Sequence, residues 1–315
     1  MRLLFIVDPL PELAAYKDSS VAMMRAASAR GHEVWAATTE VLAWESANGV
    51  RAQAVRLQLI DGDDPWYSAT VRETLCLAEF DAVLMRKDPP FDIEYVTATW
   101  LLEQAEREGA RVFNRPRALR DHSEKLVLAE FAHLAPPSLV SRDPGQIDDF
   151  IDCEGDVILK PLDGMGGRGI FRVRQDDPNR NAIIESLSGD GRSSVMAQRY
   201  LPSIAEGDKR ILLIDGDVVP YCLARLPKPG ETRGNLAAGG TGFVRPLAPR
   251  DREIAESLAP VLAARGLFFV GIDVIGEFLT EINVTSPTCM VEIARGSDVD
   301  PAVLFIAALE RACAG

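Results

Sequence analysis

Three oxygen-bearing side chains near the carboxyl end of the sequence could hold a cation. The segments Phe268–Ile275 and Leu279–Val284 alternate apolar and polar residues with a period of two, which is typical of β-strands. If the residues between them form a three-residue turn, Asp273 faces Glu281, and Asn283 lies on the same face. Carboxylate and amide oxygens this close together suit Mg²⁺. A solvated outer sheet face is the alternative interpretation.

A glycine-rich loop follows Lys160 in the middle of the chain. The stretch Gly164–Gly169 matches GxGxxG, but a dinucleotide-binding loop of that pattern must join a strand to a helix. The alternating residues Ile170–Arg174 after it predict a strand, so this loop joins two strands. Such a loop can cover nucleotide phosphates, because glycine N–H groups approach an anion closely. Alone, the loop could equally be an exposed hairpin turn; together with the acidic hairpin it indicates a Mg–ATP site.

The elements that must position these groups begin with an α/β region of about 115 residues. Strands that alternate with helices predict a parallel sheet, and its ligands bind where the strands end. The loops Asp8–Asp18 and Arg86–Pro90 leave such ends. The predicted strands are Leu3–Val7, Glu33–Ala37, Ala82–Met85 and Arg111–Phe113, and the predicted helices are Val21–Ala29 and Ile93–Glu108.

The second region combines short strands with one long irregular segment. A helix is expected at about 119–132 and others at Arg250–Arg265 and Pro301–Cys313. Leu226–Gly242 contains five glycines and no periodicity. A segment of this kind inside a compact domain usually serves as a lid or a binding loop.

Composition excludes several classes of function. The 315 residues carry 34 Lys+Arg against 47 Asp+Glu, a net charge of −13, which disfavours nucleic acid and anionic membranes as partners. No apolar run approaches the ~20 residues of a membrane span. The five cysteines are scattered and form no CxxC pair, so neither a disulfide framework nor a zinc site is indicated. We therefore expect a cytoplasmic protein.

Five stretches carry a resemblance to a known family. The sequence resembles the ATP-grasp carboxylate–amine ligases, and within them the bacterial glutathione synthetases. The stretches run from the first helix almost to the carboxyl terminus; they are Lys17–Ser20, Met85–Asp92, Leu159–Gly167, Gly230–Gly240 and Thr280–Cys289.

The resemblance implies a mixed α/β fold in three parts. Residues 1–118 would form a parallel α/β domain, which a two-part ATP-grasp fold follows. Residues 119–200 would form its central lid, and residues 201–315 would carry the metal site and a flexible flap at 226–242.

The implied reaction is the ATP-dependent joining of γ-glutamylcysteine to glycine through an acyl phosphate, which yields glutathione, ADP and phosphate. The partners are thus small molecules, and the family implies a homotetramer. One alternative is an ATP-grasp ligase for another peptide or amine. Another is a nucleotide-binding scaffold without turnover, although the predicted metal and flap residues are all present.

Residue roles also follow from the resemblance. Lys125, Lys160, Gly164, Gly166, Gly167, Gln198, Tyr200, Leu201 and Asp208 would bind ATP. Asp273, Glu281 and Asn283 would hold two Mg²⁺ ions, with Mn²⁺ as a substitute. Arg210 and Arg225 would be catalytic, and Arg86, Arg233, Ser286 and Thr288 would bind the substrates, while Cys289 is expected to be a packing residue.

Overall fold

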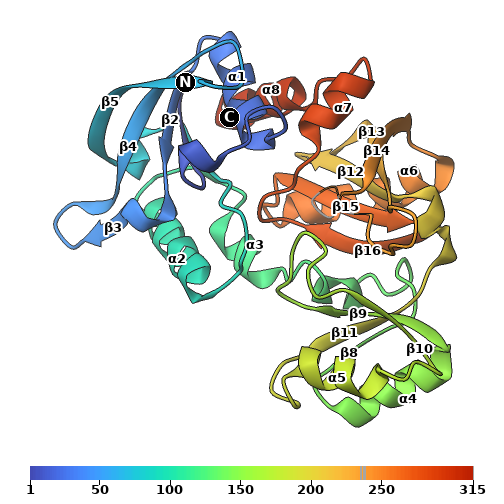
Figure 1. The fold of residues 1–315 in the computed structure, drawn as a ribbon. Coiled ribbons are helices and arrows are strands. Elements are labelled where there is room, and N and C mark those ends of the chain that lie inside the picture. Colours follow the sequence, from blue (N-terminus) through green and yellow to red (C-terminus); the bar gives the residue numbers. More distant parts are fainter. Residues whose placement is uncertain (235, 237–238, 315) are drawn as a thin grey trace.

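The computed structural model describes residues 1–234, 236 and 239–314. Consecutive parts of the chain build three β-sheets with helices packed against them (Figure 1). Asn235, Ala237 and Ala238 of the predicted flap, together with Gly315, lie outside the described residues.

The amino-terminal sheet combines parallel and antiparallel strands in the order β3-β4-β2-β1-β6-β7, with β5 beside β4. The predicted parallel arrangement is confirmed for β1, β2, β6 and β7. Strands β3, β4 and β5 extend it with antiparallel pairs that the sequence analysis did not assign. Most of β5 is exposed, so its sequence carries no buried alternation. The strands are β1 (Arg2–Ile6), β2 (Glu33–Ala37), β3 (Leu42–Glu45), β4 (Gly49–Leu59), β5 (Tyr67–Cys76), β6 (Ala82–Met85) and β7 (Val112–Phe113).

Helices α1 (Ser19–Ala29), α2 (Ile93–Arg107) and α8 (Pro301–Ala314) cover this sheet. Helices α1 and α8 share a core with the face that carries Phe5, and α2 covers the opposite face, which carries Ile6. The carboxyl-terminal helix therefore returns to the amino-terminal part of the molecule (Figure 1).

A small sheet, which we call the lid sheet, forms the part of the chain predicted as the lid. Its order is β10-β9-β11-β8, with antiparallel pairing throughout. Helices α4 (Pro144–Glu154) and α5 (Arg180–Ser188) pack on it and enclose a core of its own. The predicted glycine loop joins β9 to β10, strand to strand. The strands are β8 (Ser138–Ser141), β9 (Asp156–Pro161), β10 (Phe171–Arg174) and β11 (Val195–Arg199).

The third sheet is antiparallel, in the order β14-β13-β12-β15-β16. Helix α6 (Pro249–Ala264) packs against it, and α7 (Met290–Gly296) connects it to α8. Among the described residues, no helix is both long and apolar enough to cross a membrane. The strands are β12 (Asp208–Ile214), β13 (Asp217–Leu226), β14 (Thr241–Pro246), β15 (Phe269–Ile275) and β16 (Phe278–Asn283).

The flap predicted at 226–242 is a loop between β13 and β14. Its ends belong to the strands, because Leu226 pairs with Thr241 and Arg225 pairs with Gly242. The connecting loop is therefore shorter than the sequence suggested.

The helix predicted at about 119–132 is wrong as one continuous element. It is replaced by α3 (Pro116–Asp121) and a short 3-10 helix, η4 (Leu126–Ala129). The break has a tertiary cause: the carbonyl of Glu124 accepts a hydrogen bond from the Ile282 N–H at 2.9 Å instead of continuing a helix.

Asn114 links the amino-terminal part to the third sheet. It is only 6 % exposed, and its Nδ2 donates to the carbonyls of Phe269 (2.9 Å) and Val284 (2.8 Å). Its Oδ1 accepts from the Phe269 N–H at 2.7 Å. One amide side chain thus joins the start of β15 to the residue after β16.

We expect Asn114→Ala to lower the free energy of unfolding by about 2–4 kcal/mol, because it leaves buried backbone groups without partners. Chemical denaturation measures this difference. Asn179→Ala, at an exposed position, is the control and is expected to change stability by less than about 0.5 kcal/mol. Equal stabilities of the two variants would contradict the assignment.

Candidate active site

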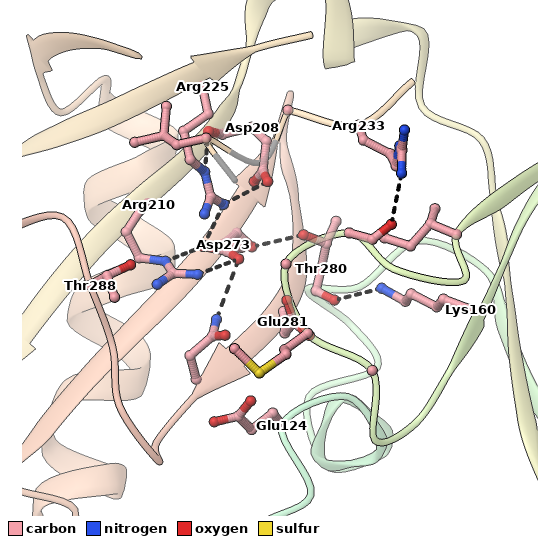
Figure 2. A pocket seen from close by; sticks show the side chains of 18 of the residues that line it. Glu124, Lys160, Asp208, Arg210, Arg225, Arg233, Asp273, Thr280, Glu281 and Thr288 are labelled. Atoms are coloured by element: carbon pink, nitrogen blue, oxygen red, sulfur yellow. Dashed lines mark hydrogen bonds and ion pairs between the residues drawn. The ribbon is translucent and has the colours of Figure 1, made fainter. Parts of the chain in front are cut away.

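One cavity of about 400 Å³ gathers almost all of the predicted site residues. Its walls come from the amino-terminal loops, the lid and the third sheet. Figure 2 shows the part formed by the lid and the third sheet. The predicted residues that line it are Lys125, Lys160, Gly164, Gly166, Gly167, Gln198, Tyr200, Leu201, Asp208, Arg210, Arg225, Arg233, Asp273, Glu281, Asn283, Ser286 and Thr288.

The acidic hairpin has the predicted cross-strand pair but a different turn. Asp273 lies opposite Glu281, as expected. Ile275 pairs with Phe278, however, so the turn has two residues rather than three. Thr280 is an extra residue in a β-bulge, and it restores the register. Its hydroxyl donates to the Asp273 carbonyl at 3.2 Å, which anchors the bulge.

A buried cluster of alternating charge surrounds Asp273 (Figure 2). Arg210 donates to both Asp273 oxygens, from Nε at 2.5 Å and from Nη2 at 2.9 Å. Nη2 of Arg225 lies 3.0 Å from Asp273 Oδ1 and 2.6 Å from Asp208 Oδ2. Asp273 is 3 % exposed and Arg225 is 4 % exposed, so each charge depends on its partners.

The two carboxylates of this cluster differ in protonation behaviour. Burial opposes ionisation of Asp273, but Arg210 and Arg225 outweigh it and hold its pKa well below the usual value. Burial, only partly offset by Arg225, raises the pKa of Asp208 to about 6. Asp208 Oδ1 is also buried and has no hydrogen-bond partner within the described chain.

Two buried lysines lie at the lid side of the cavity. Lys125 Nζ is 2.9 Å from Glu281 Oε1 and donates to the Gly164 carbonyl at 2.8 Å. Burial would lower the pKa of Lys125, but Glu281 outweighs it and the pKa lies above the usual value. Lys160 Nζ donates to Gln198 Oε1 and to the Thr280 carbonyl, both at 3.3 Å, and burial lowers its pKa.

The glycine loop needs its glycines for different reasons. A Cβ on Gly164 would lie 2.7 Å from Pro161 Cγ, so a side chain there would displace the loop. Gly166 and Gly167 have φ of 63° and 80°, in the left-handed region that glycine adopts without strain. Arg233 Nη1 donates to the Gly167 carbonyl at 3.4 Å, which connects the flap to the glycine loop.

Polar and aromatic groups at the end of β11 form the adjoining wall. Gln198 Nε2 donates to Ser138 Oγ at 3.0 Å, so its amide is fixed between that hydroxyl and Lys160. The guanidinium of Arg172 lies 3.6 Å from the ring centre of Tyr200 and holds that ring in place.

Arg86 is the predicted site residue that does not line the cavity. It is buried, and it donates from Nε to Ser20 Oγ at 3.1 Å and from Nη2 to the Pro287 carbonyl at 2.8 Å. Its guanidinium lies 5.2 Å from the ring centre of Phe269. In this geometry Arg86 supports the loop that carries Ser286.

Cys289 lies at the edge of the cavity, next to Thr288. It is buried with φ of 87°, a left-handed conformation that is uncommon outside glycine. Burial raises the pKa of its thiol, although Arg210 and Arg225 oppose the shift. A buried thiol of raised pKa reacts slowly with oxidants, as expected of a packing residue.

Several lining residues were not among the predicted site residues: Lys17, Asp18, Asp88, Glu124 and Glu292. The position of three of them was indicated, because Lys17, Asp18 and Asp88 lie in the loops after β1 and β6. No sequence pattern marked Glu124 as a site residue, apart from its position directly before Lys125.

Within the described ranges, no three His, Cys, Asp or Glu side chains form a group that could hold a metal ion. The predicted set differs from such a group, because one of its three members is an asparagine. Asn283 Nδ2 donates to the Gly271 carbonyl at 3.0 Å and to Asp273 at 3.3 Å, which leaves the amide oxygen available as an acceptor.

Comparison with known families identifies both halves of the chain. Residues 1–120 match the N-terminal domain of prokaryotic glutathione synthetase, and residues 124–298 match its ATP-grasp domain. The chain belongs to the prokaryotic glutathione synthetase family. It is therefore an ATP-grasp ligase, and its family carries out ATP-dependent glutathione synthesis.

Glutathione synthetases from other bacteria are similar in sequence to this chain over nearly its full length. It is 56 % identical to a glutathione synthetase of Ralstonia nicotianae, over 99 % of this chain and 96 % of that protein. A glutathione synthetase of Nitrosomonas europaea is 56 % identical over 99 % of this chain and 98 % of that protein.

Solved structures with lower identity show the fold. D-cycloserine synthetase DcsG aligns with a TM-score of 0.68 at 17 % identity, over 99 % of both chains. The ATP-grasp ligase PsnB, complexed with minimal precursor, Mg and ADP, aligns with a TM-score of 0.64 at 18 % identity, over 100 % of this chain and 98 % of that one.

The raised pKa of Asp208 predicts a pH dependence of nucleotide binding. Above about pH 6 the carboxylate is ionised, and as the pH falls to 5 its charged fraction drops about tenfold. If a ligand hydroxyl binds the ionised form, ADP affinity should fall by about the same factor. Calorimetry between pH 5 and 7.5 measures this effect.

Asp208→Asn is the matched control for that titration, because it keeps the size of the side chain and removes the ionisation. Titration of the nucleotide itself cancels when the two proteins are compared. Parallel pH profiles for wild type and variant would contradict the prediction.

Proposed function

We propose that this chain joins γ-glutamylcysteine to glycine in the cavity described above. ATP-dependent glutathione synthesis is the activity of its family. The observation that supports the residue roles is convergence: buried cations, a glycine loop and an acidic hairpin, from separate parts of the chain, border one cavity.

The phosphates of ATP are proposed to lie between the lid and the third sheet. Lys125 and Lys160 would neutralise their charge, and the loop Gly164–Gly167 would cover them. Phosphoryl transfer depends mainly on such positioning and charge neutralisation. The complex of PsnB with Mg and ADP supports a nucleotide in this fold.

The adenosine would occupy the adjoining wall. Gln198, Tyr200 and Leu201 lie where the chain passes from β11 toward β12, and we assign them to the adenine. Asp208 would accept a ribose hydroxyl through Oδ1, since that oxygen is buried without a partner among the described residues.

Asp273, Glu281 and Asn283 are proposed to hold two Mg²⁺ ions, or Mn²⁺ in their place. The donor set fits, because it offers two carboxylates and a free amide oxygen, and Mg²⁺ at phosphate sites takes the remaining ligands from phosphates and water. When bound, the metal would neutralise phosphate charge.

The ligation needs a reactive carboxyl group, and we assign its stabilisation to Arg210 and Arg225. The terminal carboxylate of γ-glutamylcysteine attacks the γ-phosphorus of ATP, which gives an acyl phosphate and ADP. The glycine amine then attacks the acyl carbon, loses a proton, and phosphate leaves as the amide bond forms. Negative charge on the tetrahedral intermediate is stabilised best by donors that are already oriented, as these arginines are.

The flap between β13 and β14 would exclude water from the acyl phosphate, which water hydrolyses. Arg233, about midway along the flap, would act where it reaches the Gly167 carbonyl. Ser286 and Thr288 would bind the peptide. We assign Arg86 a positioning role, since it holds the Pro287 carbonyl beside them.

We also propose a cytoplasmic homotetramer. The five free cysteines support a reducing compartment, in which thiols persist. Light scattering coupled to gel filtration measures the number of subunits.

Phosphate release should require ATP, γ-glutamylcysteine and glycine together, and omission of the dipeptide or the glycine should reduce it to background. Coupled phosphate detection and mass spectrometry of the product measure this. Turnover with another amine but not glycine would favour a ligase of different acceptor, and no peptide-dependent release at all would contradict the proposal.

Glu281→Gln should lower Mg²⁺-dependent turnover by at least about 100-fold, because it removes a carboxylate ligand and the partner of Lys125. Glu277→Gln, on the exposed turn of the same hairpin, should retain activity. Steady-state kinetics over a range of Mg²⁺ concentrations compares them. Full activity of Glu281→Gln would show that the metal site lies elsewhere.

A further inference from the structure

Strand β16 is the edge of the third sheet, and no other strand of the described residues pairs with its outer side. An edge strand needs other partners for its outward N–H groups when it is covered by protein. Here the linker between α3 and β8, residues 122–137, supplies these partners. The Leu279 N–H donates to the Leu134 carbonyl at 2.9 Å, and the Ile282 N–H donates to the Glu124 carbonyl at 2.9 Å.

The side chain of Glu124 continues this edge beyond the strand. Its Oε1 accepts from the Val284 N–H at 2.8 Å, the Thr285 N–H at 3.0 Å and the Thr285 Oγ1 at 2.9 Å. Three donors that converge on one carboxyl oxygen hold two backbone N–H groups and a hydroxyl at a single point. Glu124 therefore fixes both the end of β16 and the start of the following loop.

The residues on either side of this anchor belong to the active site. Glu281 and Asn283 precede it on β16, and Ser286 and Thr288 follow it in the loop; all four line the cavity. Figure 2 shows Glu124 beside this part of the cavity, below Glu281. The next residue along the chain, Lys125, binds Glu281 and the glycine loop.

We propose that Glu124 is a positioning residue: its three-donor anchor sets where β16 presents Glu281 and Asn283, and where the loop presents Ser286. This inference rests on the proposed function, because the roles of Glu281, Asn283 and Ser286 come from it. The anchor itself belongs to the protein without any ligand, so it can be tested separately.

The first measurement is amide hydrogen exchange of the ligand-free protein. In Glu124→Ala, exchange at Val284 and Thr285 should accelerate by about tenfold or more, because both N–H groups lose their acceptor. Glu124→Gln keeps an acceptor oxygen of the same reach and should stay within about threefold of wild type. Unchanged exchange in the alanine variant would overturn the proposal.

The second measurement is the Mg²⁺ concentration that gives half-maximal ADP binding, read by calorimetry. It should rise about tenfold in Glu124→Ala and recover in Glu124→Gln, whereas a purely structural role would lower stability and leave it unchanged. Glu130→Ala is the control on the same linker; that side chain pairs with Arg265 at 2.6 Å and does not line this cavity. A glutamine variant as impaired as alanine would overturn positioning by hydrogen bonding.

Thr285→Val covers the case in which Glu124→Ala does not fold. It removes one of the three donors, so the shift in Mg²⁺ concentration should lie between those of wild type and the alanine variant. No shift in Thr285→Val would also overturn the proposal. If wild type and Glu130→Ala bind ADP but make no glutathione, the proposed function fails while the anchor is still tested.

Discussion

The structure depends on one constraint: positive charge buried in a cavity must be compensated where it lies. Removing an unpaired charge from water costs several kcal/mol, so Lys125 and the buried arginines of this cavity have carboxylate partners, while Lys160 bonds to the Gln198 amide and the Thr280 carbonyl. Asp273 forms ion pairs with Arg210 and Arg225, and Glu281 forms an ion pair with Lys125. The whole chain has a net charge of −13, whereas the described residues that line this cavity include eight Lys and Arg against seven Asp and Glu, so the cavity is much less acidic than the chain as a whole.

These charge pairs form only if β15 and β16 pair in a register that is correct to one residue. The acidic hairpin shows how the backbone provides that register. With two turn residues and regular pairing, Asp273 would face Thr280, and Glu281 would point to the other side of the sheet. The bulge at Thr280 shifts the second half of β16 by one position. The same residue offers its carbonyl to Lys160, so one irregularity serves both the hairpin and the lysine.

Patterns of neighbouring residues in the sequence predicted those features of the site that depend on neighbouring residues. Period-two alternation placed Asp273 opposite Glu281, although the turn and the bulge were two compensating differences that alternation alone does not reveal. The glycine loop was recognised by the strand that follows it. Glu124, Asn114 and the true position of Arg86 were beyond prediction, because each acts through partners 100 or more positions away along the chain. A polar residue whose partner is distant carries no periodic signal, so such residues are found only once the fold brings the partners together.

The compensating pairs also constrain how ligands can enter. Asp273 cannot give its oxygens fully to two arginines and to a cation at the same time. A substrate carboxylate or phosphate that binds Arg225 would draw it away from Asp273 Oδ1 and make that oxygen more available to a metal ion while Arg210 stays in place, so anion and metal binding would favour each other. Asp208 pairs with the same Arg225 nitrogen, Nη2, at 2.6 Å, and this ion pair would keep the arginine oriented during the exchange. The buried ion pairs thus hold the arginines in place before substrates bind. A bound substrate would replace one ion-pair partner of an arginine and leave its other partners where they are.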